Sequence, residues 1–228
     1  MSDLHAPARE VLDQIAALAP GSGRPLVICD VDEVVFHMVR HLEVFLADRG
    51  LRFLRHAYQL TGNIGPVDGE TPIGQDEVRR LLLGFFAEVS DRQDPVEGAA
   101  DGLRALAEVG EVIFLTNLPG SANKPARERL LARHGMPYPV VTNAGPKGGA
   151  AAALSAGRGR PVVFIDDSPQ NLKSVHASLP ETHLVHFVAD DRFRAAVEPL
   201  PMAGLLSGDW QETSRHILSI LAGRQETR

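Results

Sequence analysis

The amino-acid sequence predicts an α/β protein with a mainly parallel sheet that is covered by helices on both faces. Two observations lead to this prediction. From residue 96 onward, helix-like segments alternate regularly with short apolar runs, of which VIFLTN at 112–117 and VVFID at 162–166 are the clearest. Runs that are apolar almost throughout are typical of parallel strands, because helices cover both of their faces and connect them by right-handed crossovers.

The first 95 residues are expected to hold one strand and three helices. Apolar spacing indicates a helix at 3–19, which the PGSG stretch that follows it ends, and a first strand at 25–30. A second helix is expected from Phe36 to Gly50 and a third within 75–89, both with apolar residues on one face. The residues between them, LTGNIGPVDGETPIG, have the composition of a loop.

The rest of the chain is expected to continue the alternation and to close with an amphipathic helix. The predicted helices are 98–109, 122–134, 148–156, 169–178 and 209–221. The predicted strands are 111–117, 138–143, 160–168 and 183–190.

Composition and charge exclude several classes of function. The chain of 228 residues is 44% hydrophobic and 23% charged, with a net charge of −6, which does not favour nucleic acid or anionic lipid as a partner. No apolar stretch has the length of a membrane span, and the charged N-terminus does not resemble a signal peptide. The single cysteine, Cys29, agrees with a reducing compartment, so we expect a cytoplasmic protein.

Polar residues gather where the predicted strands end. Ligands of an open parallel sheet bind beyond the carboxyl ends of its strands. The residues that the sequence places there are Asp30 and Asp32, Thr116 and Asn117, Asp166 and Asp167, together with Lys147 just ahead of a helix. Four carboxylates, a hydroxyl and an ammonium group are therefore expected to meet at one edge of the sheet.

This set of groups suits phosphoryl transfer. Carboxylate oxygens are ligands that Mg²⁺ prefers, and a metal with a lysine neutralises the charge of a phosphoryl group. A free aspartate oxygen can attack phosphorus to form an aspartyl phosphate, while a second acid protonates the leaving oxygen and then activates water. The phosphate loop of nucleoside triphosphatases needs the spacing GxxxxGK[ST], and GPKGG at 145–149 lacks it.

Four ordered motifs resemble those of the haloacid dehalogenase-like (HAD) hydrolase superfamily. They are DVDEVV at 30–35, VIFLTN, the Lys147 segment and VVFIDDS at 162–168, and they span about residues 25 to 175. The resemblance implies a Rossmann-like three-layer core and a Mg²⁺-dependent phosphatase acting on a small phosphorylated metabolite.

The resemblance also implies a role for each residue. Asp30 would be the nucleophile and a metal ligand, and Asp32 the general acid/base, with its backbone carbonyl reaching the metal. Thr116 and Asn117 would bind the substrate, and Lys147 would hold the charge of both nucleophile and phosphate. Asp166 and Asp167 would complete the metal site, with Asp167 preferred as the direct ligand. Asn171 stands where many relatives have a further acid.

Two other functions stay open at this point. Dehalogenases of the superfamily lack the second aspartate, so Asp32 favours hydrolysis of a phosphate ester. Phosphomutases share the Asp30–Asp32 pair, however, and differ in shielding the aspartyl phosphate from water. A regulatory protein that binds metal and phosphate without turnover is the remaining alternative.

The long separation of Asp30 from Thr116 predicts an insertion. Residues 36–95 would form a small helical cap placed after the first strand, and residues 1–35 and 96–228 the catalytic core. The insertion contains a group of basic residues that could form either a second anion site or a solvated surface. They are Arg40, His41, Arg49, Arg52, Arg55 and His56. The sequence does not determine the oligomeric state.

Overall fold

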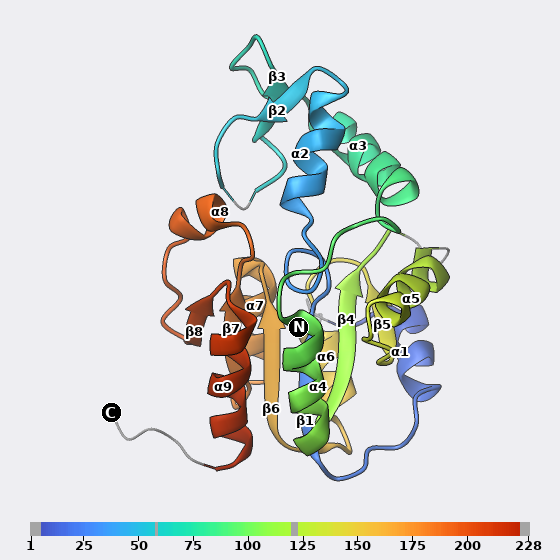
Figure 1. The fold of residues 1–228 in the computed structure, drawn as a ribbon. Helices are drawn as coiled ribbons and strands as arrows, with labels where there is room; N and C mark the ends of the chain where they lie inside the picture. The colour runs from blue at the N-terminus through green and yellow to red at the C-terminus, as the bar shows by residue number, and fades with distance from the viewer. Residues whose placement is uncertain (1–5, 58, 120–122, 224–228) are drawn as a thin grey trace.

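A six-stranded parallel sheet forms the centre of the molecule. The computed structural model describes residues 6–57, 59–119 and 123–223. The strands lie in the order β5-β4-β1-β6-β7-β8, and each neighbouring pair is parallel (Figure 1). Their bounds are β1 Pro25–Cys29, β4 Glu111–Asn117, β5 Val140–Asn143, β6 Gly159–Asp166, β7 His183–Phe187 and β8 Ala203–Ser207. The predicted α/β class with a mainly parallel sheet is confirmed.

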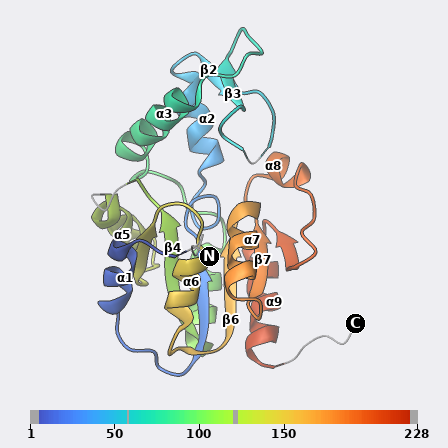
Figure 2. The ribbon, with the colours of Figure 1, turned by 180° about the vertical axis from the view of Figure 1, so that it is seen from behind.

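Helices pack on both faces of this sheet and complete a three-layer, Rossmann-like sandwich. One apolar cluster joins the sheet to α4 (Ala99–Val109), α5 (Lys124–Arg133) and α9 (Trp210–Leu221). A second cluster joins the opposite face to α1 (Arg9–Ala16), α6 (Gly148–Ser155) and α7 (Pro169–Ser178), as the reverse view shows (Figure 2). Both faces of the central strands are therefore buried, which explains their nearly continuous apolar sequences.

Residues 38–88, here called the α2–α3 segment, lie beyond the carboxyl ends of the strands (Figure 1). The segment contains α2 (Val39–Ala47), the antiparallel strands β2 (Leu51–Phe53) and β3 (Ile64–Pro66), and α3 (Gln75–Glu88). Its apolar side chains form a third cluster together with Leu118 after β4, Val188 after β7, and Phe193 from the short helix α8 (Asp191–Ala195).

The two connections between the α2–α3 segment and the sheet run side by side. Phe36, in the connection that precedes the segment, forms an antiparallel bridge with Pro95, in the connection that follows it. Two hydrogen bonds flank this bridge: His37 N–H donates to Asp94 O at 3.0 Å, and Val96 N–H donates to Val35 O at 2.9 Å.

The structure differs from the predicted elements in several places. The helix expected from Phe36 begins only at Val39, because Phe36 is held in the bridge just described. The stretch expected to be a loop includes β3, and the strands β2 and β8 and the helix α8 were not predicted. These elements have three to five residues each, too few to show a clear period. Residues 3–5 and 122 of two predicted helices lie outside the described residues.

None of the helices in the described ranges combines the length and the apolar character that crossing a bilayer requires.

Candidate active site

Three neighbouring strands bring the predicted polar residues together. Asp30 directly follows β1, which lies between β4 and β6 in the sheet. Thr116 is the last residue but one of β4, and Asp166 ends β6. The backbone N–H of Asp30 donates to Ile165 O at 2.9 Å, so the chain beyond β1 stays attached to β6. The side chains at these strand ends therefore share one edge of the sheet.

Lys147 is fully buried and pairs with two of the carboxylates. Its Nζ lies 2.7 Å from Asp30 Oδ1 and 2.7 Å from Asp166 Oδ2. Lys147 stands at the start of α6, which approaches α7 closely at Gly148. A Cβ on Gly148 would collide with Ser174 O, and the Gly148 N–H donates to Ser174 Oγ at 3.0 Å. The absence of a side chain at Gly148 thus allows the position of Lys147.

The three acids Asp30, Asp166 and Asp167 form a compact buried cluster. One oxygen from each lies within 4.8 Å of the others. Burial raises the pKa of Asp30 from 3.8 to about 7, although the Lys147 ammonium acts in the opposite direction. Burial and the nearby carboxylates also raise the pKa of Asp167 well above its usual range. Burial alone would lower the pKa of Lys147, but Asp166 and Asp30 raise it. One lysine therefore faces an excess of negative charge.

Asp166 and Asp167 have different surroundings. Both oxygens of Asp166 are occupied: Oδ2 by Lys147, and Oδ1 by the backbone N–H of Ser168 at 2.9 Å and by Asn171 Nδ2 at 3.0 Å. Asp167 instead lines the pocket described below. The amide of Asn171 thus donates a hydrogen bond to Asp166. An acid at position 171 would instead repel the Asp166 carboxylate.

The side chain of Asp32 does not join the acid cluster but pairs with a buried arginine. Arg127 Nη2 donates to both carboxylate oxygens of Asp32, at 2.9 and 3.2 Å, and Arg127 is only 2% exposed. Gln93 completes the network, because its Nε2 donates to Asp32 Oδ1 at 3.0 Å and its Oε1 accepts from Arg127 Nη1 at 2.9 Å. The orientation of Asp32 is therefore fixed from both sides.

Arg127 and Gln93 were not predicted as site residues from the sequence. A signal for Arg127 was present, because it precedes Leu130 and Leu131 by three and four positions and so shares their buried helix face. An arginine on an apolar face needs a buried partner. Gln93 lies in the connection between α3 and α4, where no periodicity marks it.

Thr116 and Asn117 hold different positions at the end of β4. The Thr116 hydroxyl is buried and has no hydrogen-bond partner among the described residues. Asn117 Nδ2 donates to Gly145 O at 3.0 Å, and its Oδ1 accepts from Asn143 Nδ2 at 2.9 Å. Thr116 thus offers a donor to the site, whereas Asn117 fastens the loop that leads to Lys147.

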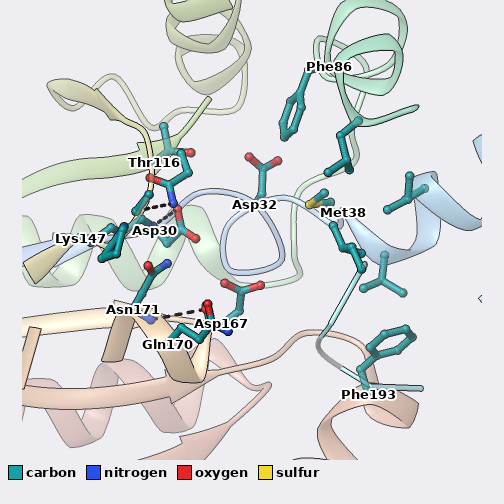
Figure 3. A pocket seen from close by; sticks show the side chains of 18 of the residues that line it. Asp30, Asp32, Met38, Phe86, Thr116, Lys147, Asp167, Gln170, Asn171 and Phe193 are labelled. Carbon is teal, nitrogen blue, oxygen red and sulfur yellow. Dashed lines mark hydrogen bonds and ion pairs between the residues drawn. The ribbon is translucent and has the colours of Figure 1, made fainter. Parts of the chain in front are cut away.

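A pocket of about 390 Å³ connects these groups to the α2–α3 segment. Asp30, Asp32, Thr116, Lys147 and Asp167 line its polar end. The opposite wall, here called the apolar end, consists of Met38, Val39, Leu42, Phe53, Ala57, Leu60, Leu82, Phe86 and Phe193. Figure 3 shows Asp30 and Lys147 on one side, Met38, Phe86 and Phe193 on the other, and Asp32 between them.

A buried glutamate ties the α2–α3 segment to the sheet. Glu33, in a left-handed conformation with φ 63°, accepts hydrogen bonds from the backbone N–H groups of Met38 and Val39 at the start of α2. Its other oxygen accepts from the backbone N–H of Asp190, at the start of α8. Burial raises the pKa of Glu33, while these three hydrogen bonds lower it. One side chain thus links α2, α8 and the turn after β1.

The basic residues of the α2–α3 segment lie outside the pocket. Arg49 pairs with Glu88 at 3.0 Å and Arg52 with Glu70 at 2.7 Å, on the surface. His41 lies 3.2 Å from Asp94. None of the six basic residues considered as an anion site belongs to the described lining of the pocket. The geometry therefore favours the solvated surface over the second anion site.

Solved structures share this fold at low sequence identity. An L-2-haloacid dehalogenase matches with a TM-score of 0.52 and 14% identity, over 86% of this chain and 100% of the other. A HAD family hydrolase from Deinococcus radiodurans, with bound phosphate and sodium, matches with a TM-score of 0.52 and 17% identity, over 88% and 97%. YfnB from Bacillus subtilis, described as a HAD-hydrolase and bound to magnesium, matches with a TM-score of 0.55 and 12% identity, over 86% and 99%.

The chain therefore has the fold of the haloacid dehalogenase-like hydrolases, as its four motifs predicted. No protein-family model matches the sequence, and no curated protein matches it either.

Proposed function

We propose that this protein is a magnesium-dependent phosphatase that hydrolyses a small phosphorylated metabolite through an aspartyl phosphate. The observation that carries the proposal is that Asp30 and Asp32 line one pocket but have different partners. Asp30 contacts Lys147, and Asp32 forms an ion pair with Arg127. Two carboxylates in such different surroundings can take different roles, one as nucleophile and one as proton carrier.

The chemistry follows from these positions. An oxygen of Asp30 attacks phosphorus, and the bond from phosphorus to the substrate oxygen breaks as Asp32 gives that oxygen a proton. Asp32 then takes a proton from water, whose oxygen attacks the aspartyl phosphate and releases phosphate and free Asp30. Lys147 and the buried Thr116 hydroxyl stabilise the negative oxygens of the phosphoryl group. Asn117 supports the substrate site by holding the loop before Lys147.

The donor set fits a hard divalent cation. The available donor atoms are carboxylate oxygens, which Mg²⁺ prefers as ligands. The carboxylates carry more negative charge than Lys147 can neutralise, so a further cation would be stabilised among them. We propose Asp30 and Asp167 as direct ligands, with the backbone carbonyl of Asp32, while Asp166 acts mainly through Lys147. When bound, the metal would neutralise charge on the phosphoryl group. The phosphate and the magnesium in the two named neighbours support this assignment.

The α2–α3 segment forms most of the proposed cap. We propose residues 36–95 as the cap and residues 1–35 and 96–228 as the catalytic core, because most apolar residues of the segment pack apart from the two clusters that cover the sheet, and the segment faces the strand ends. In this role it excludes water from the reacting groups. The structure makes it a mixed unit rather than a purely helical one, since β2 and β3 belong to it. The proposal includes the cytoplasmic location expected from the sequence.

The test is hydrolysis of an aryl phosphate in the presence of Mg²⁺ or of a chelator. Turnover should require the metal and should disappear in Asp30→Asn, which also controls for contaminating phosphatases. Asp32→Asn should be severely slowed, most of all with a poor leaving group. Activity that persists in Asp30→Asn would rule out the assigned nucleophile, and turnover with a chelator present would rule out the metal.

A further inference from the structure

The two ends of the pocket differ sharply in polarity. All described residues that the α2–α3 segment contributes to the lining are apolar, and Leu42 and Phe86 are examples that are almost fully buried. The charged residues of the lining, including Asp30 and Lys147, belong to the polar end. A phosphoryl group held at the polar end would thus extend the rest of its molecule into apolar surroundings.

Among the described residues, the apolar end contains no side chain that could pair with a charge. The arginines of the segment with described ion pairs, Arg49 and Arg52, are engaged with glutamates on the surface. A substrate carboxylate or second phosphate in the apolar end would lose its water and find no cation among the described residues of that wall. Burying an unpaired charge in this way is strongly unfavourable.

The wall is closed in part by a residue outside the α2–α3 segment. Phe193 of α8 packs edge-on against Phe53, with ring centroids 5.2 Å apart. The adjacent Arg192 bridges Glu43 of α2 and Asp190 at 2.7 Å each. The apolar end is therefore built in part by contacts between α8 and the segment.

From these observations, and resting on the proposed function, we propose that the substrate is a phosphate monoester of an uncharged, apolar alcohol. A pocket of about 390 Å³ would hold about a dozen non-hydrogen atoms at the volume that each water occupies in the liquid. The specificity then comes from burial of alkyl or aromatic carbon against the apolar end, without recognition of a second anionic group.

The first experiment compares phenyl phosphate with 4-carboxyphenyl phosphate in Mg²⁺. The carboxylate makes the phenolate a better leaving group, so chemistry alone favours the charged ester. We expect kcat/KM to favour phenyl phosphate by about 100-fold or more. A series of straight-chain alkyl phosphates should show kcat/KM rising about fourfold per methylene until the apolar end is filled.

A pair of arginine variants tests where the preference arises. Leu82 lines the pocket, whereas its neighbour Leu83 is 47% exposed on the same helix and does not belong to the described lining. Leu82→Arg should supply a cation to the apolar end and reduce the preference for phenyl phosphate at least tenfold. Leu83→Arg carries the same change of charge and should leave the preference as in the wild-type protein.

The outcomes separate this inference from the function on which it rests. Turnover that is equal or faster with the charged ester, or a flat alkyl series, overturns the apolar substrate while leaving the phosphatase intact. If no ester is hydrolysed, the phosphatase proposal fails, and calorimetric binding of benzylphosphonate against 4-carboxybenzylphosphonate decides the inference. Tighter binding of the uncharged compound supports an apolar ligand; equal or weaker binding refutes it.

Discussion

Replacing Asp30 by asparagine should make the metal-free protein more stable while it removes turnover. Asp30 is 6% exposed, and burial raises its pKa from 3.8 to about 7. The folded state therefore binds a proton at Asp30 more tightly than the unfolded state does. As the pH rises from about 4 to about 7, the free energy of unfolding should fall. The full loss of stability from ionising the buried Asp30 is present above pH 7.

The size of the effect follows from the same shift. A rise of about three pKa units corresponds to about 4 kcal/mol. The shift already includes the attraction of Lys147, so the Asp30→Asn substitution would avoid much of this cost, and Lys147 would keep Asp166 as its partner. We therefore expect Asp30→Asn to raise the free energy of unfolding by about 1 to 3 kcal/mol at pH 8.

Urea unfolding at pH 5 and pH 8, with a chelator, measures the difference. The exposed Asp68 offers a matched control, since Asp68→Asn makes the same chemical change away from the acid cluster. Adding Mg²⁺ should stabilise the wild-type protein more than Asp30→Asn, because a ligand that binds the folded state shifts the equilibrium toward it. The reasoning is wrong if Asp30→Asn is less stable than the wild type at pH 8 in the chelator.

Three further substitutions probe the surroundings of the site. Arg127→Met should lower kcat at least tenfold and the free energy of unfolding by about 3 kcal/mol, because it leaves the Asp32 carboxylate buried and unpaired; an unchanged kcat in steady-state assays would contradict a positioning role. Gly148→Ala should reduce kcat/KM at least tenfold, because its Cβ would collide with Ser174 O and shift Lys147; wild-type kinetics would show that α6 yields without moving the lysine. Glu33→Gln should cost about 1 to 2 kcal/mol in urea unfolding, because the amide NH2 that replaces one carboxylate oxygen cannot accept from the backbone N–H groups facing it; no loss would show that the second oxygen is dispensable.

The strand ends could be read from the sequence because they are local patterns. An apolar run that stops at an aspartate identifies both a buried strand and its carboxyl end, so Asp30 and Asp166 could be placed without knowing the fold. Parallel pairing then places these ends on one edge of the sheet, and they are neighbours because β1 lies between β4 and β6. The same reasoning predicts the acids, Thr116 and Lys147 at one edge, where the structure has them.

Long-range partners could not be read in this way. The contact between Arg127 and Asp32 joins residues 95 positions apart, and it depends on how α5 packs rather than on any local spacing. The position of the basic residues relative to the pocket also depends on which face of α2 points toward the pocket and on the pairing of β2 with β3. Side-chain partners therefore require the folded arrangement even where the elements themselves are predictable.

The paired crossing at Phe36 and Pro95 brings both chain connections of the α2–α3 segment to one place. A sideways displacement of the segment would break the flanking hydrogen bonds of His37 and Val96. The two connections of the segment lie side by side at this bridge. Another segment with closely spaced ends could therefore be grafted there without altering the sheet. Under the proposed function, the reacting residues lie at the strand ends and the residues that select the substrate lie mainly in the α2–α3 segment, so either set could be re-engineered while the other is kept.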